Sequence, residues 1–275
     1  MTGRWVSSLL TVSLLLGMGS LSPWVEAQTV LVQGRLSQRE VEELLQEALK
    51  QTRQGQPVQA IETFERVLEA ARQWQHRQLE AVALLGIGRN YNRIGQRQKA
   101  LEFYEQALIP FRETNNRSGE ATILTNIGLV YNALGNRTKS LDYFNQALPI
   151  FREVGDRSGE ATTLSNIASV YRDTNQPDKA ITHWEDSLNI LLSLRSELQK
   201  EFRETFLQTN RGPAVALVDI LIDQNQPQRA FEWANRFTTY ELADYNRLIG
   251  VRVANPEAQA ALDDRKIGYK PRPLA

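Results

Sequence analysis

The pattern of apolar and polar positions between residues 41 and 200 repeats every forty residues. Frames that start at Val41, Ala81, Ala121 and Ala161 all carry leucine at position 4 and a small residue at position 20. Position 24 is aromatic throughout, and its occupants are Phe64, Tyr104, Phe144 and Trp184. Self-similarity at a fixed spacing indicates that one structural unit is stacked several times.

Within each frame the apolar residues follow the period of an α-helix. In the third frame Leu124, Ile127 and Tyr131 fall on one helical face, and a second apolar stripe begins at Leu141. Between the stripes, position 15 is glycine or asparagine in every frame, and these residues tolerate the positive φ that ends a helix. The pattern predicts an all-α fold, a solenoid of antiparallel helix pairs.

The small and aromatic positions resemble the signature of the tetratricopeptide (TPR) repeat over residues 41–192. This resemblance implies a right-handed superhelical solenoid with four TPR-like repeats in residues 41–200. The usual unit has about 34 residues, so the forty-residue units here are longer. The extra length falls in "PFRETNNRSG" and "PIFREVGDRSG", and we expect the second helix of each pair to run on by about one turn.

The decapeptide "RETNNRSGEA" at residues 112–121 returns as "REVGDRSGEA" at residues 152–161. We interpret it as the corner between successive repeats, with Asn116 and Asp156 as helix N-caps. The arginine and glutamate after each cap stand at i, i+3 and predict two ion pairs, Arg117–Glu120 and Arg157–Glu160. We expect these pairs to be exposed and to contribute tenths of a kcal/mol, on the order of other surface pairs.

After the fourth frame the period weakens. Residues 201–252 predict a long helix and a degenerate fifth repeat that caps the solenoid, because terminal repeats face solvent on one side. The long helix is expected over "SLRSELQKEFRETFLQTNRG", and the fifth repeat places Asn225 on its turn and Ala230 at the small position. Its core face would contain Leu217 and Leu221. Residues 253–275 lose the period and predict a disordered tail.

Composition and motifs exclude several kinds of function. Lysine plus arginine (32) balances aspartate plus glutamate (32), which argues against a nucleic-acid partner. The absence of cysteine removes disulfides, thiolate metal sites and cysteine nucleophiles. The sequence has no phosphate-binding glycine loop, HExxH or GxSxG, and its two histidines, His76 and His183, occupy non-equivalent positions. We therefore expect no catalytic residues, metal site or cofactor, and a protein that is not an enzyme.

The first 27 residues predict a signal peptide. Arg4 precedes an apolar run from Leu9 to Met18, and Val25-Glu26-Ala27 offers a cleavage site before Gln28. The alternative is an uncleaved anchor, but the run is shorter than the roughly 20 residues that span a bilayer. We expect export to the periplasm or beyond, with no membrane span after cleavage and a linker at residues 28–40.

The binding surface is expected on the concave side, which the first helix of each pair lines. Such surfaces bind extended peptides or partner helices, so a protein or peptide is the predicted partner. The tyrosines at position 11 of three frames are expected in the core and not on a stacking platform. The predicted partner-binding residues are Arg89, Asn92, Arg93, Thr122, Asn126, Asn132, Ser165, Asn166, Ser169 and Arg172.

Asn126 and Asn166 both occupy position 6, in "LTNIGLVYNALG" and "LSNIASVYRDTN". This motif resembles the repeats of kinesin light chains and of Pins-like polarity adaptors, a resemblance that implies an asparagine holding a peptide backbone. A side-chain amide both donates and accepts hydrogen bonds, which suits an extended backbone. The alternative interpretation is a polar residue that merely faces the groove. Gly86 stands at this position in the second frame, so such a clamp would be short.

Residues 229–262, "RAFEWANRFTTYELADYNRLIGVRVANPEAQAAL", resemble the segment that joins TPR repeats to the caspase-like CHAT domain of bacterial, especially cyanobacterial, proteins. In that family a downstream histidine and cysteine form a protease dyad, and neither is present here. Three hypotheses follow: an exported scaffold, the truncated sensor half of a CHAT protease, and a hydrolase of unrecognised type. The repeats leave few residues for a second folded domain, which disfavours the third.

Overall fold

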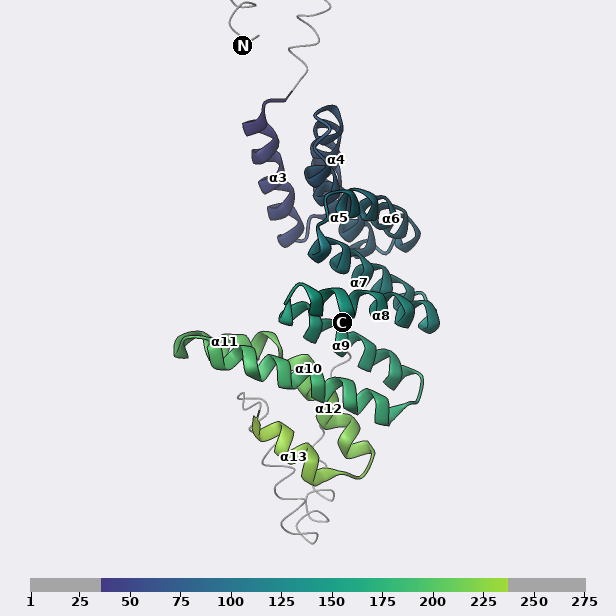
Figure 1. The fold of residues 1–275 in the computed structure, drawn as a ribbon, viewed down its shortest axis with the longest axis vertical. Helices are drawn as coiled ribbons and strands as arrows, with labels where there is room; N and C mark the ends of the chain where they lie inside the picture. The colour runs from purple at the N-terminus through teal and green to yellow at the C-terminus, as the bar shows by residue number, and fades with distance from the viewer. Residues whose placement is uncertain (1–35, 237–275) are drawn as a thin grey trace, which may run out of the picture.

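A computed structural model describes residues 36–236, and this part of the chain is built of helices without a strand (Figure 1). The predicted leader at 1–27 and tail at 253–275 lie outside the described residues, as does most of the linker. The helices are α3 (Gln38–Arg53), α4 (Pro57–Gln73), α5 (Arg77–Arg93), α6 (Arg97–Glu113), α7 (Arg117–Ala133), α8 (Arg137–Glu153), α9 (Arg157–Asp173), α10 (Pro177–Glu197), α11 (Lys200–Thr209), α12 (Arg211–Asp223) and α13 (Pro227–Arg236).

The helices pack in sequential pairs, α3 with α4, α5 with α6, α7 with α8, α9 with α10 and α12 with α13. Figure 1 shows these pairs stacked along the long axis of the molecule. The second helix of each pair also contacts the first helix of the next pair, as α6 contacts α7 and α8 contacts α9. The all-helical solenoid of antiparallel helix pairs predicted from the sequence is therefore confirmed.

The turn inside each pair requires the residue found at position 15. Gly135 has φ +80°, and Asn175 and Asn225 have φ +56° and +57°. In the third pair the Asn136 N–H donates to the Tyr131 carbonyl at 2.9 Å, which closes the end of α7. Such a closing bond needs a left-handed residue before it, so glycine or asparagine recurs at this position.

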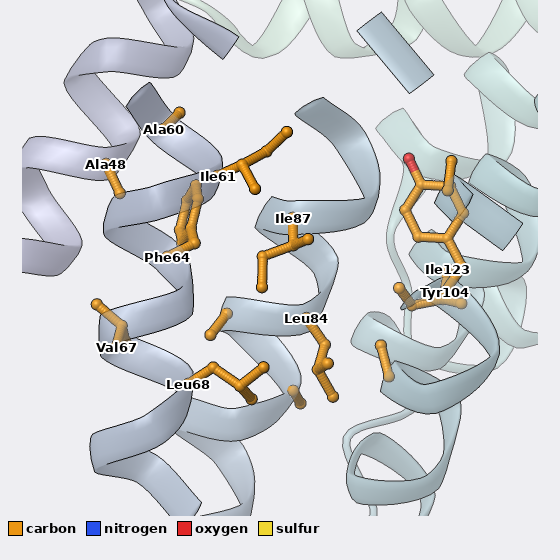
Figure 2. Packing of buried hydrophobic residues seen from close by; sticks show 14 of the residues in the cluster. Ala48, Ala60, Ile61, Phe64, Val67, Leu68, Leu84, Ile87, Tyr104 and Ile123 are labelled. Atoms are coloured by element: carbon orange, nitrogen blue, oxygen red, sulfur yellow. The ribbon is translucent and has the colours of Figure 1, made fainter. Parts of the chain in front are cut away.

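Large aromatic side chains fill the space between the helices of a pair. Figure 2 shows Phe64 and Tyr104 between neighbouring helices with Leu84 and Ile87, and all four side chains are almost completely buried. In the third pair, a Cβ placed on Gly128 would lie only 2.6 Å from Cε1 of the buried Phe144 ring. The small residue on α7 therefore lets the ring from α8 pack directly against the helix backbone.

The corner between repeats begins with the predicted N-caps. The Asn116 Oδ1 accepts a hydrogen bond from the Gly119 N–H at 2.8 Å, and the Asp156 Oδ1 accepts one from the Gly159 N–H at 2.8 Å. Each cap satisfies one of the free N–H groups at the start of its helix. The predicted capping role of both residues is confirmed.

The glutamates of the ion pairs at these corners are buried, contrary to expectation, while their arginines stay partly exposed. Glu120 is only 7% exposed, and its carboxylate accepts hydrogen bonds from Arg117 and, at 2.8 Å, from the Arg112 Nε. Arg117 also pairs with Glu153 of the next corner at 3.1 Å. The prediction missed the burial because Arg112 and the neighbouring Phe111 lie on the preceding helix, α6, and are not part of the i, i+3 pair.

The same clamp occurs at two other corners. Glu80 is bound by Arg72 at 3.0 Å and Arg77 at 2.8 Å, and Glu160 by Arg152 at 2.8 Å and by Arg157. Burial acts to raise the pKa of Glu80, but the hydrogen bonds and charges of both arginines outweigh burial and leave that pKa below its ordinary value. The recurring decapeptide is thus a buried carboxylate clamp between repeats.

The long helix expected over residues 193–212 is in fact two helices. The chain breaks at Leu198, which is extended with ψ 152°, between the end of α10 and the start of α11. Arg203 explains how the break is stabilised, because its guanidinium donates to the carbonyls of Leu198 at 3.0 Å and Ser196 at 3.2 Å. Beyond it, Leu217, Leu221 and Ala230 are fully buried in the fifth pair.

Between residues 36 and 236, no helix combines the length and the apolar content needed to cross a membrane.

Candidate functional site

The first helices of successive pairs contact one another, α3 with α5, α5 with α7 and α7 with α9. Among the described helices, no comparable contact joins α4 with α6 or α6 with α8. Successive helices approach more closely on the inside of a curved stack than on the outside. We therefore call α3, α5, α7 and α9 the inner layer and their solvent-facing surface the inner face.

Polar contacts join the inner layer. The buried Asn90 of α5 donates from Nδ2 to the Thr52 Oγ1 of α3 at 3.0 Å. The Thr125 Oγ1 of α7 lies 3.5 Å from the Thr163 Oγ1 of α9. Residues about forty apart thus lie next to each other across the layer, as the repeat period predicts.

All ten predicted partner-binding residues lie on α5, α7 and α9, and each keeps some surface open to solvent. Thr125, which lies between two of them, is instead buried and donates to the Ala121 carbonyl at 2.9 Å. Thr122 and Ser169 likewise direct their hydroxyl protons to carbonyls four residues back in their own helices. These hydroxyl groups keep only acceptor capacity for a partner.

The side chains of the two asparagines at position 6 are not engaged by hydrogen bonds within the described residues, and neither is that of the predicted site residue Asn92. The Asn166 Nδ2 is buried and has no hydrogen-bond partner, and the Asn126 side chain forms no hydrogen bond within residues 36–236. Asn116 and Asn136, in contrast, are engaged as helix caps. A buried amide N–H without a partner costs roughly 1 to 3 kcal/mol. Because the Asn166 Nδ2 is shielded from solvent, its side chain must turn toward the inner face before the amide can donate to a ligand.

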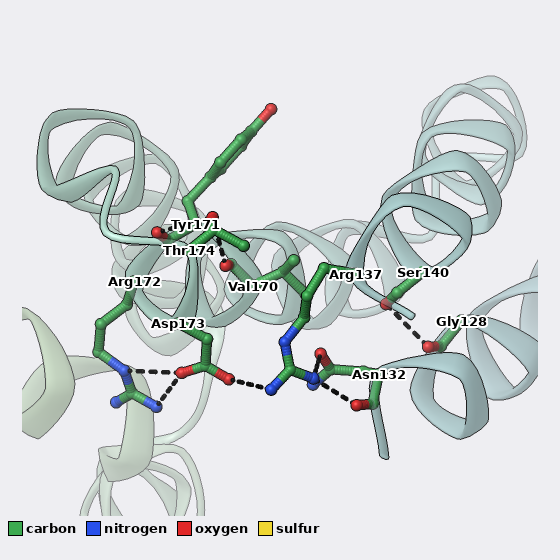
Figure 3. Close-up of polar contacts among 9 residues, drawn as sticks. All are labelled: Gly128, Asn132, Arg137, Ser140, Val170, Tyr171, Arg172, Asp173 and Thr174. Atoms are coloured by element: carbon green, nitrogen blue, oxygen red, sulfur yellow. Dashed lines mark hydrogen bonds and ion pairs between the residues drawn. The ribbon is translucent and has the colours of Figure 1, made fainter. Parts of the chain in front are cut away.

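Asn132 is held inside the protein by a network that sequence reasoning missed. Figure 3 shows the Arg137 guanidinium of α8 directed at Asn132 of α7 and at Asp173 of α9. Its Nη1 donates to the Asn132 Oδ1 at 2.5 Å, and its Nη2 lies 3.2 Å from Asp173. Arg137 is the first residue of the next helix, so the inner-face positions alone gave no signal for it.

The three predicted arginines are not equivalent. The Arg93 Nη1 donates to the Thr52 carbonyl at 2.5 Å and so satisfies the end of α3. Arg172 lies 3.3 Å from the Asp173 carboxylate, which reduces its attraction for other anions. Arg89 is exposed and forms no ion pair or hydrogen bond within the described residues, so it is the least engaged of the three.

Apolar side chains also contribute to the inner face, although the ten predicted partner-binding residues are all polar or charged. Leu129 at position 9 of α7 is 37% exposed. Leu45 and Leu49 of α3 and Leu85 of α5 occupy positions 5 and 9 and are half-buried. The repeat frame itself contained this signal, since these are the positions from which the polar candidates were taken.

The tyrosines expected in the core lie at its edge and are half-buried. Tyr131 stacks on Tyr143 at 5.5 Å between ring centroids, and the Lys139 ammonium lies 4.9 Å from its centroid. Tyr91 and Tyr171 make corresponding contacts, with Phe103 and Lys99 and with His183 and Lys179. Their contacts involve side chains of this chain, in line with a packing role.

His76 caps α5 by accepting from the Leu79 N–H at 3.2 Å.

The chemistry offered by the described residues is that of recognition. Between residues 36 and 236, no cluster of three or more histidine, aspartate or glutamate side chains is placed to bind a metal. Two open hollows lie against α3, and their walls are mostly charged side chains. The inner face itself supplies amides, hydroxyls, a free guanidinium and exposed leucine, which are groups that bind polypeptide.

Comparison with known proteins agrees with the repeat pattern. Residues 48–108 and 119–193 match the tetratricopeptide repeat family model. Among curated proteins, none matches the chain.

Solved structures resemble the chain in fold at low sequence identity. A Podosopora anserina kinesin light chain protein with nearly identical TPR-like repeats has a TM-score of 0.54 and 17% identity, over 78% of this chain and 97% of that one. BtubC (BKLC) from P. vanneervenii has a TM-score of 0.54 and 22% identity, over 86% and 85%. The apo quorum sensor NprR from B. thuringiensis has a TM-score of 0.54 and 14% identity, over 87% and 68%.

These likenesses concern the fold alone, since all three identities are low. The family match covers α4, α5, α8 and α9 entirely, together with most of α7 and parts of α3, α6 and α10. The forty-residue period, the paired helices and the family match agree, and residues 48–193 are therefore built of tetratricopeptide repeats.

Proposed function

We propose that this protein is an exported TPR scaffold that binds a peptide or protein partner on its inner face. The observation that carries the proposal is the state of Asn126 and Asn166. These amides occupy the same repeat position on adjacent inner helices, and no hydrogen bond within the described residues engages them. Groups left unpaired in the free protein are the ones that gain most from a ligand.

An extended peptide suits this arrangement. Each of its residues presents a backbone N–H and a C=O, and an asparagine amide can accept from the first and donate to the second. Asn126 and Asn166 would hold the backbone at two points about one repeat apart. The uncompensated charge of Arg89 would favour an acidic side chain beside it.

The test is partner affinity in matched variants. A partner is first isolated on the immobilised full chain, and its dissociation constant is then measured for Asn126→Ala/Asn166→Ala. Two lost hydrogen bonds contribute about 1 kcal/mol each, so affinity should fall at least about tenfold while the melting temperature does not fall. Asn145→Ala, at an exposed position on α8, is the control and should leave affinity unchanged. Unchanged affinity in the folded double variant would contradict the proposal.

Export is part of the proposal and rests on residues 1–27 alone. An exported protein without cysteine gains no disulfides in an oxidising compartment, so its stability must come from packing. The buried aromatic side chains and the carboxylate clamps between repeats supply such packing.

The alternative function is the truncated sensor half of a CHAT protease. It is supported by the resemblance at residues 229–262, of which only residues 229–236 are described. The nucleotide sequence downstream of the gene tests it directly. A continuing reading frame with histidine and cysteine motifs would favour a protease, and its absence would favour the scaffold.

A further inference from the structure

Tyr104 is the one hydroxyl-bearing side chain at position 24 of the four repeats. The other occupants are Phe64, Phe144 and Trp184, and all four side chains are almost completely buried. No group within residues 36–236 forms a hydrogen bond with the Tyr104 hydroxyl, which Figure 2 shows as a red atom. A phenol in a core is less favourable than a phenyl ring unless its hydroxyl finds a partner, so packing alone does not explain this tyrosine.

The Tyr104 ring packs beside an inner-face arginine. A Cβ placed on Gly88 would lie 2.6 Å from the Tyr104 Cε1, so the ring lies on the α5 backbone next to Arg89. In the fourth pair, the ring of Trp184 at the same position has its centroid 5.6 Å from the guanidinium carbon of Arg172, another inner-face residue. Rings at position 24 therefore reach the base of the inner face.

The hydroxyl of Tyr104 touches solvent although its ring does not. The residue is 1% exposed, yet its oxygen is not sealed from solvent as the unpaired Asn90 Oδ1 and Asn166 Nδ2 are. Burial raises the pKa of Tyr104, and the positive charge of Arg89 acts in the opposite direction. The hydroxyl is therefore protonated at neutral pH, and it lies within reach of the Arg89 charge.

Arg89 has no anion beside it in the protein. Its guanidinium forms no ion pair within the described residues, and the acidic residues of α5 and α7, Glu80 and Glu120, are both buried in the clamps. On α3 the exposed Glu42 occupies position 2, seven residues and about 10 Å along the axis from the level of position 9. The inner face around Arg89 is thus positively charged and open to a ligand.

A guanidinium and a protonated phenol both donate hydrogen bonds. The group that suits them carries negative charge and accepts at two points, and a carboxylate has one oxygen for each donor. Apolar surface adjoins the two donors. Leu85 lies one turn before Arg89 on α5 and is half-buried, and Leu129 lies at the level of Arg89 on α7 and is 37% exposed.

We infer that Arg89 and the Tyr104 hydroxyl form a subsite for an acidic side chain of the bound peptide, with Leu85 and Leu129 contacting its aliphatic neighbours. The inference rests on the proposed function and adds Tyr104, the apolar neighbours and a spacing. Asn126 lies one helix along and three residues before the level of Arg89, so the two points are about 10 Å apart. At roughly 3.3 Å per extended residue, the acidic residue lies within about three residues of the one that Asn126 holds.

The carboxylate is expected from a side chain and not from the end of the peptide. The inner layer continues past α5 to α3, where Leu45 and Leu49 keep part of their surface open. A peptide held on α7 and α9 can therefore run on past Arg89. The path from α3 to α9 is about 30 Å, which about nine extended residues cover.

The experiment uses the full chain and three fluorescein-labelled peptides of about nine residues, the length of this path. Each has serine and leucine around a central residue, which is glutamate in the first peptide and glutamine in the other two. The first two end in an amide and the third in a free carboxylate. Fluorescence anisotropy should show the glutamate peptide binding at least about tenfold more tightly than the other two, the scale of a hydrogen bond to a charged group.

Tyr104→Phe makes the test specific, because it removes only the hydroxyl and leaves the ring found in the first and third repeats. The glutamate peptide should bind this variant about tenfold more weakly, while the affinity of the glutamine peptide stays the same. The melting temperature should not fall, since the hydroxyl forms no hydrogen bond in the free protein. Arg89→Gln should remove the preference for glutamate. Tyr143→Phe on α8 also removes an unbonded hydroxyl and is the matched control, which should change neither affinity.

Several outcomes would overturn the inference. Equal affinity of the glutamate and glutamine peptides, tightest binding of the free carboxylate terminus, or failure of all three peptides at about 1 mM would remove the subsite. An unchanged glutamate preference in folded Tyr104→Phe would remove the hydroxyl from it. If partner binding still depends on Asn126 and Asn166 in these cases, the scaffold function stands and only the acidic subsite fails.

Discussion

Replacing Gly128 with leucine tests the packing of a single repeat. Gly128 lies on α7 where the ring of Phe144 from α8 packs directly on the backbone. A Cβ alone would lie 2.6 and 2.7 Å from two ring carbons, whereas carbon atoms in contact are about 3.5 to 4.0 Å apart. Phe144 is completely buried, so its ring has no solvent space into which it can move.

Two opposing effects determine how much Gly128→Leu changes the free energy of unfolding. Removing a glycine from a helix interior stabilises it by about 1 kcal/mol. Overpacking a core costs about 1 to 3 kcal/mol for modest insertions, and leucine adds three carbons beyond the Cβ that already clashes. We therefore expect a net loss of more than about 2 kcal/mol in the free energy of unfolding. Gly128→Ala should lose less, since Ala168 holds the same position beside Trp184 in the next repeat.

Urea unfolding followed by circular dichroism measures the effect. With a urea slope of about 1 to 3 kcal/mol per molar, the midpoint should fall by about 1 M. Gly212→Leu is the matched control, because no atom lies within 4 Å of a Cβ placed there, and its midpoint should hardly change. An unchanged midpoint for Gly128→Leu would show that α8 does not pack on α7 through Phe144.

Three further predictions concern the corners and the leader. Glu120→Gln should destabilise the protein by about 1 kcal/mol in urea titrations, a modest loss because Arg112 and Arg117 remain partly solvated; the exposed Glu153→Gln should change little. Because the pKa of Glu80 is lowered in the folded state, its contribution is present above the unfolded value near 4.3 and is lost as pH falls through the folded pKa. Glu80→Gln should thus lower the urea midpoint at pH 6 but hardly at pH 3, and an equal effect at both would refute the clamp. N-terminal sequencing of protein from cells should begin at Gln28; a cytosolic chain starting at Met1 would exclude export.

The fold could be predicted from the sequence because each repeat carries the residues that its turn and its helix packing require. Gly135 and Asn175 stand where the backbone needs a positive φ, and Phe144 stands where Gly128 leaves room for a ring. These are local or nearest-neighbour requirements, so a period of forty residues displays them four times over. The N-cap at Asn116 could be predicted for the same reason, since capping involves only three following residues.

The features that were missed involve residues brought together only by folding. Glu120 is buried because Arg112 approaches it from the preceding helix, so i, i+3 spacing gave the pair but not its environment. Asn132 is held by Arg137, and Asp173 joins them from the next repeat. The break at Leu198 depends on Arg203 turning back toward the end of α10, a contact with no periodic signal.

The binding surface is the central claim, and its most direct test observes the two asparagine amides themselves. In the protein labelled with ¹⁵N, each side-chain NH₂ gives its own resonances, which single Asn→Ala variants assign. Adding the isolated partner should shift the resonances of Asn126 and Asn166, while those of the cap residues Asn116 and Asn136 stay in place. The account would be contradicted if saturating partner left the resonances of Asn126 and Asn166 unchanged. It would also be contradicted if the partner shifted only resonances of second helices, such as that of Asn145 on α8.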